Sequence, residues 1–255
     1  MRFSGIRAFV SGGASGLGRA VAARVIAQGG QAVLFDLNAV QGTAAAAELG
    51  ERAHFVPGDV SDETAIERCL AFAGERLGGI DLAVTCAGIG SGGRLIGRSG
   101  PMSAEFFRRM LEINLVGTLL CCRGAAQLMQ RNAADAQGER GLIVMTASIA
   151  AFDGQIGQVA YSASKGAIVA MTLPMARELA SSGIRVVTIA PGIFHTPMLA
   201  ALPEAAQTSL GQQVPFPQRL GRPEEYASLV AHIAENSMLN GETIRLDGAL
   251  RMSPR

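Results

Sequence analysis

The chain has 255 residues, of which 17% are charged, and a formal net charge of +1 at pH 7. The sequence contains no cluster of Lys and Arg, which argues against nucleic acid or an anionic membrane surface as a partner. No apolar run reaches the roughly 18 residues that a membrane span requires. The length suffices for one large α/β domain with a substantial core.

The cysteines and the first residues indicate the compartment. Cys69, Cys86, Cys121 and Cys122 show no Cys-x-x-Cys spacing and no paired His, so neither a metal site nor a disulfide framework is expected. The chain passes from Met1 almost directly into its first apolar run, which leaves no room for a signal or transit peptide. These features predict a soluble protein of the cytoplasm.

Short apolar runs alternate with longer amphipathic segments. The predicted strands are Ile6–Val10, Gln31–Phe35, Ala53–Val56, Leu82–Cys86, Leu142–Thr146, Arg185–Ile189 and Thr243–Leu246. The predicted helices are Leu17–Gln28, Ala39–Leu49, Asp62–Arg76, Ala104–Arg131, Val159–Leu179 and Glu224–Glu235. This alternation predicts the α/β class: a single doubly wound (Rossmann) domain over residues 1–255, with seven parallel strands and helices on both faces.

A glycine-rich connection follows the first strand. Ser11-Gly12-Gly13-Ala14-Ser15-Gly16-Leu17-Gly18 leads into the first helix. Glycines let the backbone turn sharply and approach a ligand, and the N-terminus of the following helix attracts phosphate. Between a first strand and its helix, such a loop predicts a dinucleotide site.

Asp36 closes the second strand, eighteen residues beyond Gly18. An acidic residue at roughly this distance hydrogen-bonds the adenosine ribose of NAD. Its charge also repels the 2′-phosphate of NADP, and neither Leu37 nor Asn38 offers a compensating cation. The position therefore predicts NAD, although an Asp here can also cap the next helix.

Tyr161 and Lys165 lie four residues apart on one predicted helix, so their Cβ atoms should be about 5–6 Å apart. A phenol titrates near pH 10, and a neighbouring ammonium is expected to lower the pKa of Tyr161. Ser148 follows a predicted strand and can hold the oxygen that Tyr161 protonates or deprotonates. Taken alone, a Tyr and a Lys at this spacing are more simply explained as two residues on a helix surface. Pro174, further along, is expected to kink or split the helix.

Three other features bear on the site. Asn114, inside Ala104–Arg131, is expected to bend its helix and hold a water that relays protons to Lys165, unless it only bonds its own backbone. Gln155 can meet a substrate oxygen, or equally stabilise its loop. Residues 193–219 are irregular and proline-rich, which predicts a lid over the substrate.

Taken together, these residues resemble the short-chain dehydrogenase/reductase family over essentially the whole chain. The family's glycine motif corresponds to Ser11–Gly18, and its adenine-contacting pair to Asp59-Val60. Its Asn-Asn-Ala-Gly turn survives only as Thr85-Cys86-Ala87-Gly88, without the amide that usually braces the central strand. The family's catalytic residues correspond to Asn114, Ser148, Tyr161 and Lys165, and its carboxamide-holding segment to Pro191-Gly192 and Thr196.

The resemblance implies the residues of the site. NAD is expected to contact Gly12, Ser15, Gly16, Leu17, Gly18, Asp36, Asp59, Val60, Cys86, Ala87, Gly88, Tyr161, Lys165, Pro191, Gly192, Phe194 and Thr196. The substrate is expected to contact Ser148, Gln155 and Tyr161, and no metal is implied. His195 and the segment Gly90–Gly100 depart from the pattern, and both are expected near the substrate.

The second half resembles most closely the family members that act on 3-hydroxyacyl-CoA thioesters. The matching segments include Gly154–Gln158, Val214–Pro217 and Arg219–Gly221. This resemblance implies NAD-dependent oxidation of short or branched 3-hydroxyacyl-CoA in fatty acid metabolism, and a homotetramer. The alternatives are a 3-oxoacyl carrier-protein reductase, a secondary-alcohol or hydroxysteroid dehydrogenase, and a dinucleotide-binding scaffold. Asp36 disfavours the reductase, which usually uses NADPH, and the intact catalytic residues disfavour the scaffold.

Overall fold

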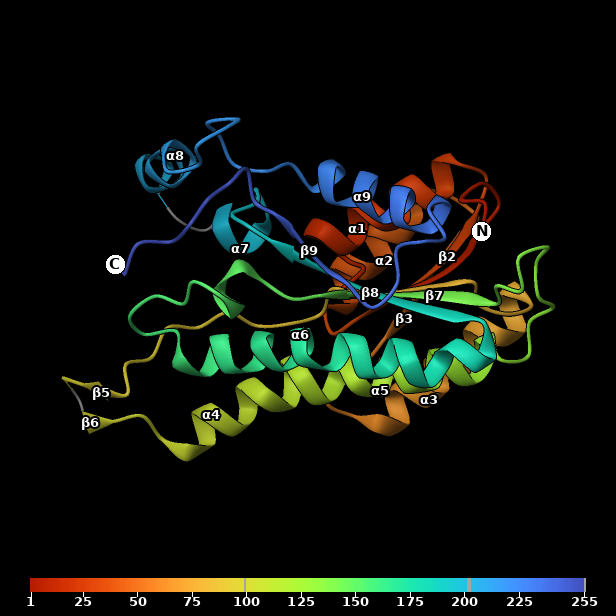
Figure 1. Ribbon diagram of the computed structural model, residues 1–255, viewed down its shortest axis with the longest axis horizontal. Coiled ribbons are helices and arrows are strands. Elements are labelled where there is room, and N and C mark those ends of the chain that lie inside the picture. The colour runs from red at the N-terminus through yellow and green to blue at the C-terminus, as the bar shows by residue number, and fades with distance from the viewer. Residues whose placement is uncertain (99, 201–202, 255) are drawn as a thin grey trace.

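A seven-stranded parallel sheet forms the centre of the molecule, as the computed structural model shows for residues 1–98, 100–200 and 203–254 (Figure 1). Its strands are β1 (Arg7–Ser11), β2 (Gln31–Asp36), β3 (Ala53–Pro57), β4 (Leu82–Thr85), β7 (Gly141–Thr146), β8 (Ile184–Pro191) and β9 (Thr243–Leu246). Their order across the sheet is β3-β2-β1-β4-β7-β8-β9. A short antiparallel hairpin, β5 (Ile96–Gly97) with β6 (Gly100–Pro101), lies outside this sheet.

Helices cover both faces of the sheet. They are α1 (Gly16–Ala27), α2 (Ala39–Leu49), α3 (Glu63–Leu77), α4 (Ala104–Leu111), α5 (Gly117–Met129), α6 (Val159–Leu179), α7 (Pro197–Ala200), α8 (Glu204–Gln212) and α9 (Pro223–Glu235). A π-helical turn, η1 (Glu112–Val116), joins α4 to α5, and two 3₁₀ turns, η2 (Ile149–Ala151) and η3 (Ala180–Ser182), flank α6. The predicted doubly wound single domain is confirmed.

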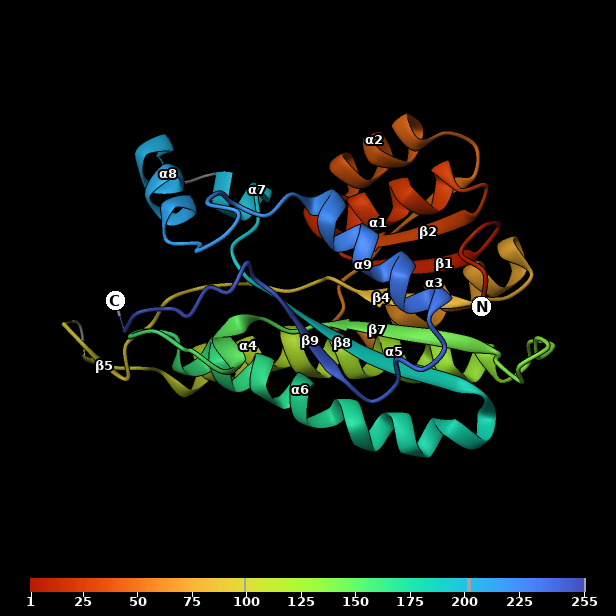
Figure 2. The same ribbon diagram turned by 45° about the horizontal axis from the view of Figure 1, so that its top comes forward.

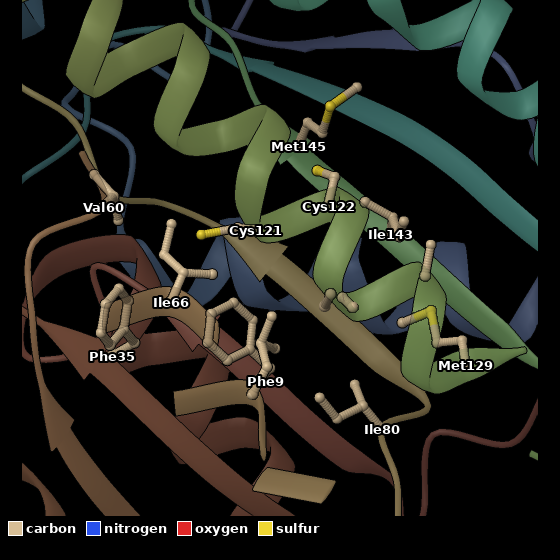
Figure 3. Packing of buried hydrophobic residues seen from close by; sticks show 14 of the residues in the cluster. Phe9, Phe35, Val60, Ile66, Ile80, Cys121, Cys122, Met129, Ile143 and Met145 are labelled. Carbon is tan, nitrogen blue, oxygen red and sulfur yellow. The ribbon is translucent and has the colours of Figure 1, made fainter. Parts of the chain in front are cut away.

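Two apolar layers hold the helices to the sheet. Helices α3, α5 and α6 pack on one face, and α1, α2 and α9 on the other (Figure 2). Figure 3 shows the first layer, where Phe9 and Phe35 from the sheet meet Ile66 of α3 and Cys121 of α5. Strands β1, β2, β4 and β7 contribute buried residues to both layers, which explains why their sequences lack polar alternation.

The strand order creates the crevice in which a ligand can bind. From β1 the chain builds outward to β2 and β3, and then returns to place β4 on the other side of β1. The connections that leave β1 and β4 therefore run in opposite directions and open a space at the carboxyl ends of the strands. The loops after Ser11 and after Thr85 both border this space.

The helix carrying Tyr161 and Lys165 is not split at Pro174, so that part of the prediction is wrong. Helix α6 runs unbroken from Val159 to Leu179. Pro174 and Ala170, whose carbonyl loses its partner, are both exposed, so water can satisfy that carbonyl.

The predicted helix Ala104–Arg131 is one continuous path but not one regular helix. The π-helical turn η1 interrupts it around Asn114, at the point where the sequence suggested a bend. The hairpin β5–β6 and the helices α7 and α8 were not predicted, because their short, glycine- and proline-rich segments carry no periodic pattern.

Across the residues that the structure describes, no helix combines the length and apolar character needed to span a bilayer.

The hydroxyl of Thr85, at the end of β4, offers a test of the core. Its side chain is 2% exposed, and Oγ1 has no hydrogen-bond partner among the described residues. We expect Thr85→Val to raise the free energy of unfolding by about 1 kcal/mol, because it removes a buried unsatisfied hydroxyl at constant shape. Urea denaturation measures the change.

Thr172→Val is the matched control for this substitution. Thr172 Oγ1 lies 3.0 Å from the Ile168 carbonyl oxygen and 2.6 Å from Thr188 Oγ1, so its loss should lower stability by about 1 kcal/mol. If Thr85→Val destabilises the protein as much as the control does, the Thr85 hydroxyl has a partner and the assignment fails.

Candidate active site

A cavity of about 710 Å³ lies at the carboxyl ends of the strands. It contains every residue that the sequence assigned to the cofactor, together with Ser148. These residues come from the loops after β1, β2, β3, β4, β7 and β8, and from the start of α6, so sequence-distant motifs converge on one space. A volume of this size lies within the roughly 300–1,000 Å³ of small-molecule sites.

The glycine-rich loop is shaped by close backbone contacts. A Cβ atom at Gly12, whose φ is +67°, would lie 2.6 Å from the backbone nitrogen of Ala87. A Cβ atom at Gly18 would lie 2.3 Å from the carbonyl oxygen of Gly12. Side chains at either position would push apart the loops that follow β1 and β4, so the glycines allow the backbone to pack closely beside the cavity.

The N-terminus of α1 faces this cavity. Ser15 is the N-cap residue, but no described side chain caps the first turn, and no acidic residue lies in it. Free N–H groups and the positive end of the helix dipole therefore remain available to an anion such as a phosphate.

Asp36 ends β2, three strands away from β7, which is the strand that precedes Ser148. Its Oδ2 accepts a hydrogen bond from the Ala14 backbone N–H at 3.1 Å, and its Oδ1 accepts one from the Asn38 N–H at 3.0 Å. The carboxylate thus braces the glycine-rich loop while it also lines the cavity. The N-cap of α2 is Asn38 and not Asp36, so the alternative role of Asp36 as the helix cap is excluded.

Asp59 and Val60 occupy the loop after β3. Asp59 Oδ1 accepts hydrogen bonds from the N–H and the hydroxyl of Ser61, at 2.9 and 2.7 Å, which fixes the carboxylate at the cavity wall. Val60 is buried against Gly117, where a Cβ atom would approach the Val60 side chain to 2.8 Å. The pair therefore forms a rigid edge of the cavity.

Ser148, Tyr161 and Lys165 lie together. Ser148 lies close enough to Tyr161 to act to lower the pKa of the phenol, but burial has the larger effect, and the pKa of Tyr161 is raised above its usual value. Lys165 Nζ is 6.0 Å from the centre of the Tyr161 ring. The predicted grouping is present. The predicted lowering of the Tyr161 pKa by Lys165 is wrong for this structure, because desolvation dominates.

The side chain of Lys165 is buried. Only 6% of its surface is exposed, and Nζ donates to the backbone carbonyl of Thr146 at 2.9 Å. Burial lowers its pKa from 10.5 to about 8. The ammonium is therefore present at neutral pH but is held at a cost in free energy.

Asn114 does not line the cavity, but it bonds groups that border it. It is fully buried in η1. Its Oδ1 accepts from the Ile89 N–H at 2.8 Å, and its Nδ2 donates to the Ile89 carbonyl at 3.0 Å and to Ser164 Oγ at 3.1 Å. The amide thus ties the loop after β4 to α6. Its predicted role in a proton relay stays a prediction.

Gln155 does not line the cavity, and its assignment as a substrate contact stays a prediction. Its Nε2 donates to the carbonyl of Ser253 in the C-terminal segment at 3.0 Å. Gln158 lines the cavity instead. Its Oε1 accepts from the Gln155 N–H at 3.0 Å, which leaves the Gln158 NH₂ group to face a ligand.

His195 also lies away from the predicted substrate site. It is exposed and borders a second cavity of about 680 Å³ between α1 and α9, together with Arg19 and Arg24. Of the segment Gly90–Gly100, only Gly90, Ser91 and Gly92 line the main cavity, and Ser99 lies outside the described residues.

Several lining residues were not predicted. Among them are Leu37, Ile113, Thr146, Gln158, Leu199 and Met252. Helical spacing identifies Gln158, one turn before Tyr161, and adjacency identifies Leu37 and Ile113, each next to a predicted site residue. No local sequence pattern predicts Met252 as a cavity residue, because only the folded path of the C-terminal segment brings it to the cavity.

The residues present fit a dinucleotide. The closely packed glycine-rich loop and the uncapped N-terminus of α1 suit a diphosphate, and the Asp36 carboxylate suits a ribose diol. Within the described part of the chain, no group of three or more His, Cys, Asp or Glu side chains is arranged to hold a metal ion.

The fold and this site define an oxidoreductase of the Rossmann type, and the chain belongs to the short chain dehydrogenase family, whose sequence pattern it matches over residues 7–207. It is 53% identical to 3-hydroxyacyl-CoA dehydrogenase type-2 of Drosophila melanogaster, over 96% of this chain and 97% of that protein. It is 52% identical to the protein of that name from Homo sapiens, over 98% and 97%. The crystal structure of 3-hydroxyacyl-CoA dehydrogenase type-2 from Mycobacterium avium superimposes with a TM-score of 0.94 at 42% identity, over 98% of each chain.

The buried ammonium of Lys165 predicts a pH-dependent stability. Below about pH 8 both the folded and unfolded states hold the proton, so the full cost of burying the charge is present. Between about pH 8 and 10.5 only the unfolded state holds it, so this contribution to stability improves as pH rises.

Lys165→Met should therefore raise the free energy of unfolding near neutral pH by up to about 3 kcal/mol. The gain should shrink at about pH 10, where the wild-type lysine no longer carries its charge when folded. Urea denaturation at both pH values measures this. A destabilised Lys165→Met variant near neutral pH would show that the bond to Thr146 outweighs desolvation.

Proposed function

We propose that this protein is an NAD-dependent dehydrogenase that interconverts 3-hydroxyacyl-CoA and 3-oxoacyl-CoA, with Tyr161 as the general acid and base. The observation that carries the proposal is that Ser148, Tyr161 and Lys165 line the same cavity as Asp36 and the glycine-rich loop. The full-length similarity to proteins named 3-hydroxyacyl-CoA dehydrogenase type-2 supports the substrate class.

The chain's own residues handle the proton. In the reductive direction Tyr161 donates its phenolic proton to the substrate oxygen. A phenol is protonated at neutral pH, and burial raises the pKa of Tyr161 further. Ser148 hydrogen-bonds the same oxygen and stabilises its developing charge. In the oxidative direction Tyr161 takes the proton back, while the Lys165 ammonium stabilises the phenolate. The nicotinamide, when bound, accepts or supplies the hydride.

The remaining parts of the cavity position the ligands. We assign the backbone of Gly12, Gly16 and Gly18 to the diphosphate, and the NH₂ group of Gln158 to the acyl oxygen that the sequence had assigned to Gln155. Residues 193–219, of which 201 and 202 lie outside the described residues, act as the lid, since Phe194 and Leu199 of that segment line the cavity.

The assembly is proposed to be a homotetramer, as the resemblance to family members that act on 3-hydroxyacyl-CoA thioesters implies. Leu119 on α5 and Leu173 on α6 are 42% and 44% exposed, which fits a surface that a second copy covers. The cytoplasm is the proposed compartment, because all four cysteines are free thiols and a reducing environment preserves them.

The substrate class is tested by following NADH absorbance with acetoacetyl-CoA, 2-methylacetoacetyl-CoA, an acyl carrier-protein thioester and a ketosteroid. We expect the highest kcat/KM with the CoA thioesters. Preference for the carrier-protein thioester would favour the reductase, and preference for the ketosteroid would favour a hydroxysteroid dehydrogenase.

Tyr161→Phe should lower kcat by on the order of 10²–10⁴-fold, because it removes the proton that the substrate oxygen must gain or lose. NADH affinity, followed by fluorescence titration, should stay within about threefold of wild type, because this substitution retains the ring. A variant with near-normal kcat would refute the acid–base role.

Asp36→Asn should lower the ratio of kcat/KM for NAD to that for NADP by about tenfold or more, because the repulsion of the 2′-phosphate is lost. Asp59→Asn is the control, since it removes a carboxylate from the same cavity and should affect both cofactors in parallel. A wild-type preference for NADP would contradict the assignment of Asp36.

A further inference from the structure

Tyr226 connects the far side of the sheet to the active site. It lies on α9, fully buried, on the face opposite the α6 helix that carries Tyr161 and Lys165. Its hydroxyl is 2.7 Å from Thr146 Oγ1, at the carboxyl end of β7. Thr146 lines the cavity, whereas Tyr226 does not.

Three polar side chains close a ring of hydrogen bonds at this point. Thr146 Oγ1 donates to Cys86 Sγ at 3.4 Å, and the Cys86 thiol donates to the Tyr226 hydroxyl at 3.9 Å. Each group has one hydrogen, so the Tyr226 hydroxyl donates to Thr146 and all three donors are used. The ring joins the ends of β4 and β7 to α9 and fixes the side chain of Thr146 from two sides.

The backbone carbonyl of Thr146 receives the catalytic ammonium. Lys165 Nζ donates to it at 2.9 Å in a buried setting, where a hydrogen bond from a charged donor is strong and direction-dependent. The position of this carbonyl therefore sets the position of Nζ relative to the Tyr161 ring, 6.0 Å away.

We propose that Tyr226 is a positioning residue for Lys165 and acts through Thr146. The inference rests on the proposed function, in which Lys165 supports Tyr161. The proposal also explains how the protein compensates for Thr85-Cys86, which lack the amide of the family's Asn-Asn pair. The Cys86 thiol is a weak hydrogen-bonding group, and the Tyr226 phenol on α9 is a stronger partner for the side chains at the ends of β4 and β7.

The test compares kinetic pH profiles of four variants. Tyr226→Phe removes the hydroxyl and keeps the ring, Thr146→Val removes its partner, the double variant measures their coupling, and Thr146→Ser keeps a hydroxyl at the same place. Thr172→Val is the control for lost stability alone, since it breaks a buried hydroxyl pair between α6 and β8 and neither of the two residues lines the cavity.

We expect Tyr226→Phe to lower kcat/KM about fivefold to twentyfold, and to move the alkaline limb of the profile down by about half a pH unit. The alkaline limb moves because a misplaced Thr146 carbonyl stabilises the Lys165 ammonium less, which lowers the pKa of Lys165. Tyr161 and Cys86 are the titratable groups that face Lys165. Thr146→Val should show the same changes, the double variant no more than either single one, and Thr146→Ser should retain the wild-type profile.

The outcomes separate this inference from the function on which it rests. If wild type turns over a substrate but Tyr226→Phe matches Thr172→Val in both rate and pH profile, Tyr226 is only structural and the inference fails. Additive losses in the double variant would also overturn it, since the two hydroxyls would then act independently. An inactive wild type would overturn the proposed function and the inference together.

Discussion

The candidate active site is built around one buried charge. Lys165 places an ammonium inside the protein at the end of the cavity, where desolvation lowers its pKa to about 8. A charge in this setting persists only if a polar group meets it, and the Thr146 carbonyl does so at 2.9 Å. The end of β7, the face of α6 and the helix α9 behind the sheet are therefore all constrained by the need to hold this group. A stable core alone would not require such an arrangement, which is typical of a functional site.

The alternation of strands and helices, and the motifs at strand ends, could be read from the sequence because each depends on local chemistry. β9, α2 and α6 begin and end where the periodicity placed them. Every predicted cofactor residue lines one cavity, since parallel strands bring their carboxyl ends to one edge. The sequence could not supply what long-range contacts decide. Gln155 and Gln158 look alike in the sequence, but the Ser253 carbonyl holds the first away from the cavity.

Burial, more than spacing, explains the other differences. The i, i+4 spacing brought Tyr161 and Lys165 to one helix face as expected, but their pKa values depend on how much water the surrounding loops exclude. Desolvation raises the pKa of Tyr161 and lowers that of Lys165, so each moves toward its neutral form. Local spacing predicts the partner, whereas the sign of the shift depends on the whole fold. Pro174 shows the same limit, because the exposed side of α6 tolerates a break in hydrogen bonding that a buried side would not.

The turn after β4 has Thr85-Cys86 where the family pattern has Asn-Asn. An amide at Cys86 could donate and accept strong hydrogen bonds, whereas a thiol does both weakly. The corner formed by β4 and β7 therefore needs another polar partner, and a tyrosine reaches it from the opposite face of the sheet. Asn114 performs the corresponding task one loop further on, where its amide bonds both backbone groups of Ile89. Two buried polar side chains that do not line the cavity thus bond groups that border it, Asn114 from one face of the sheet and Tyr226 from the other.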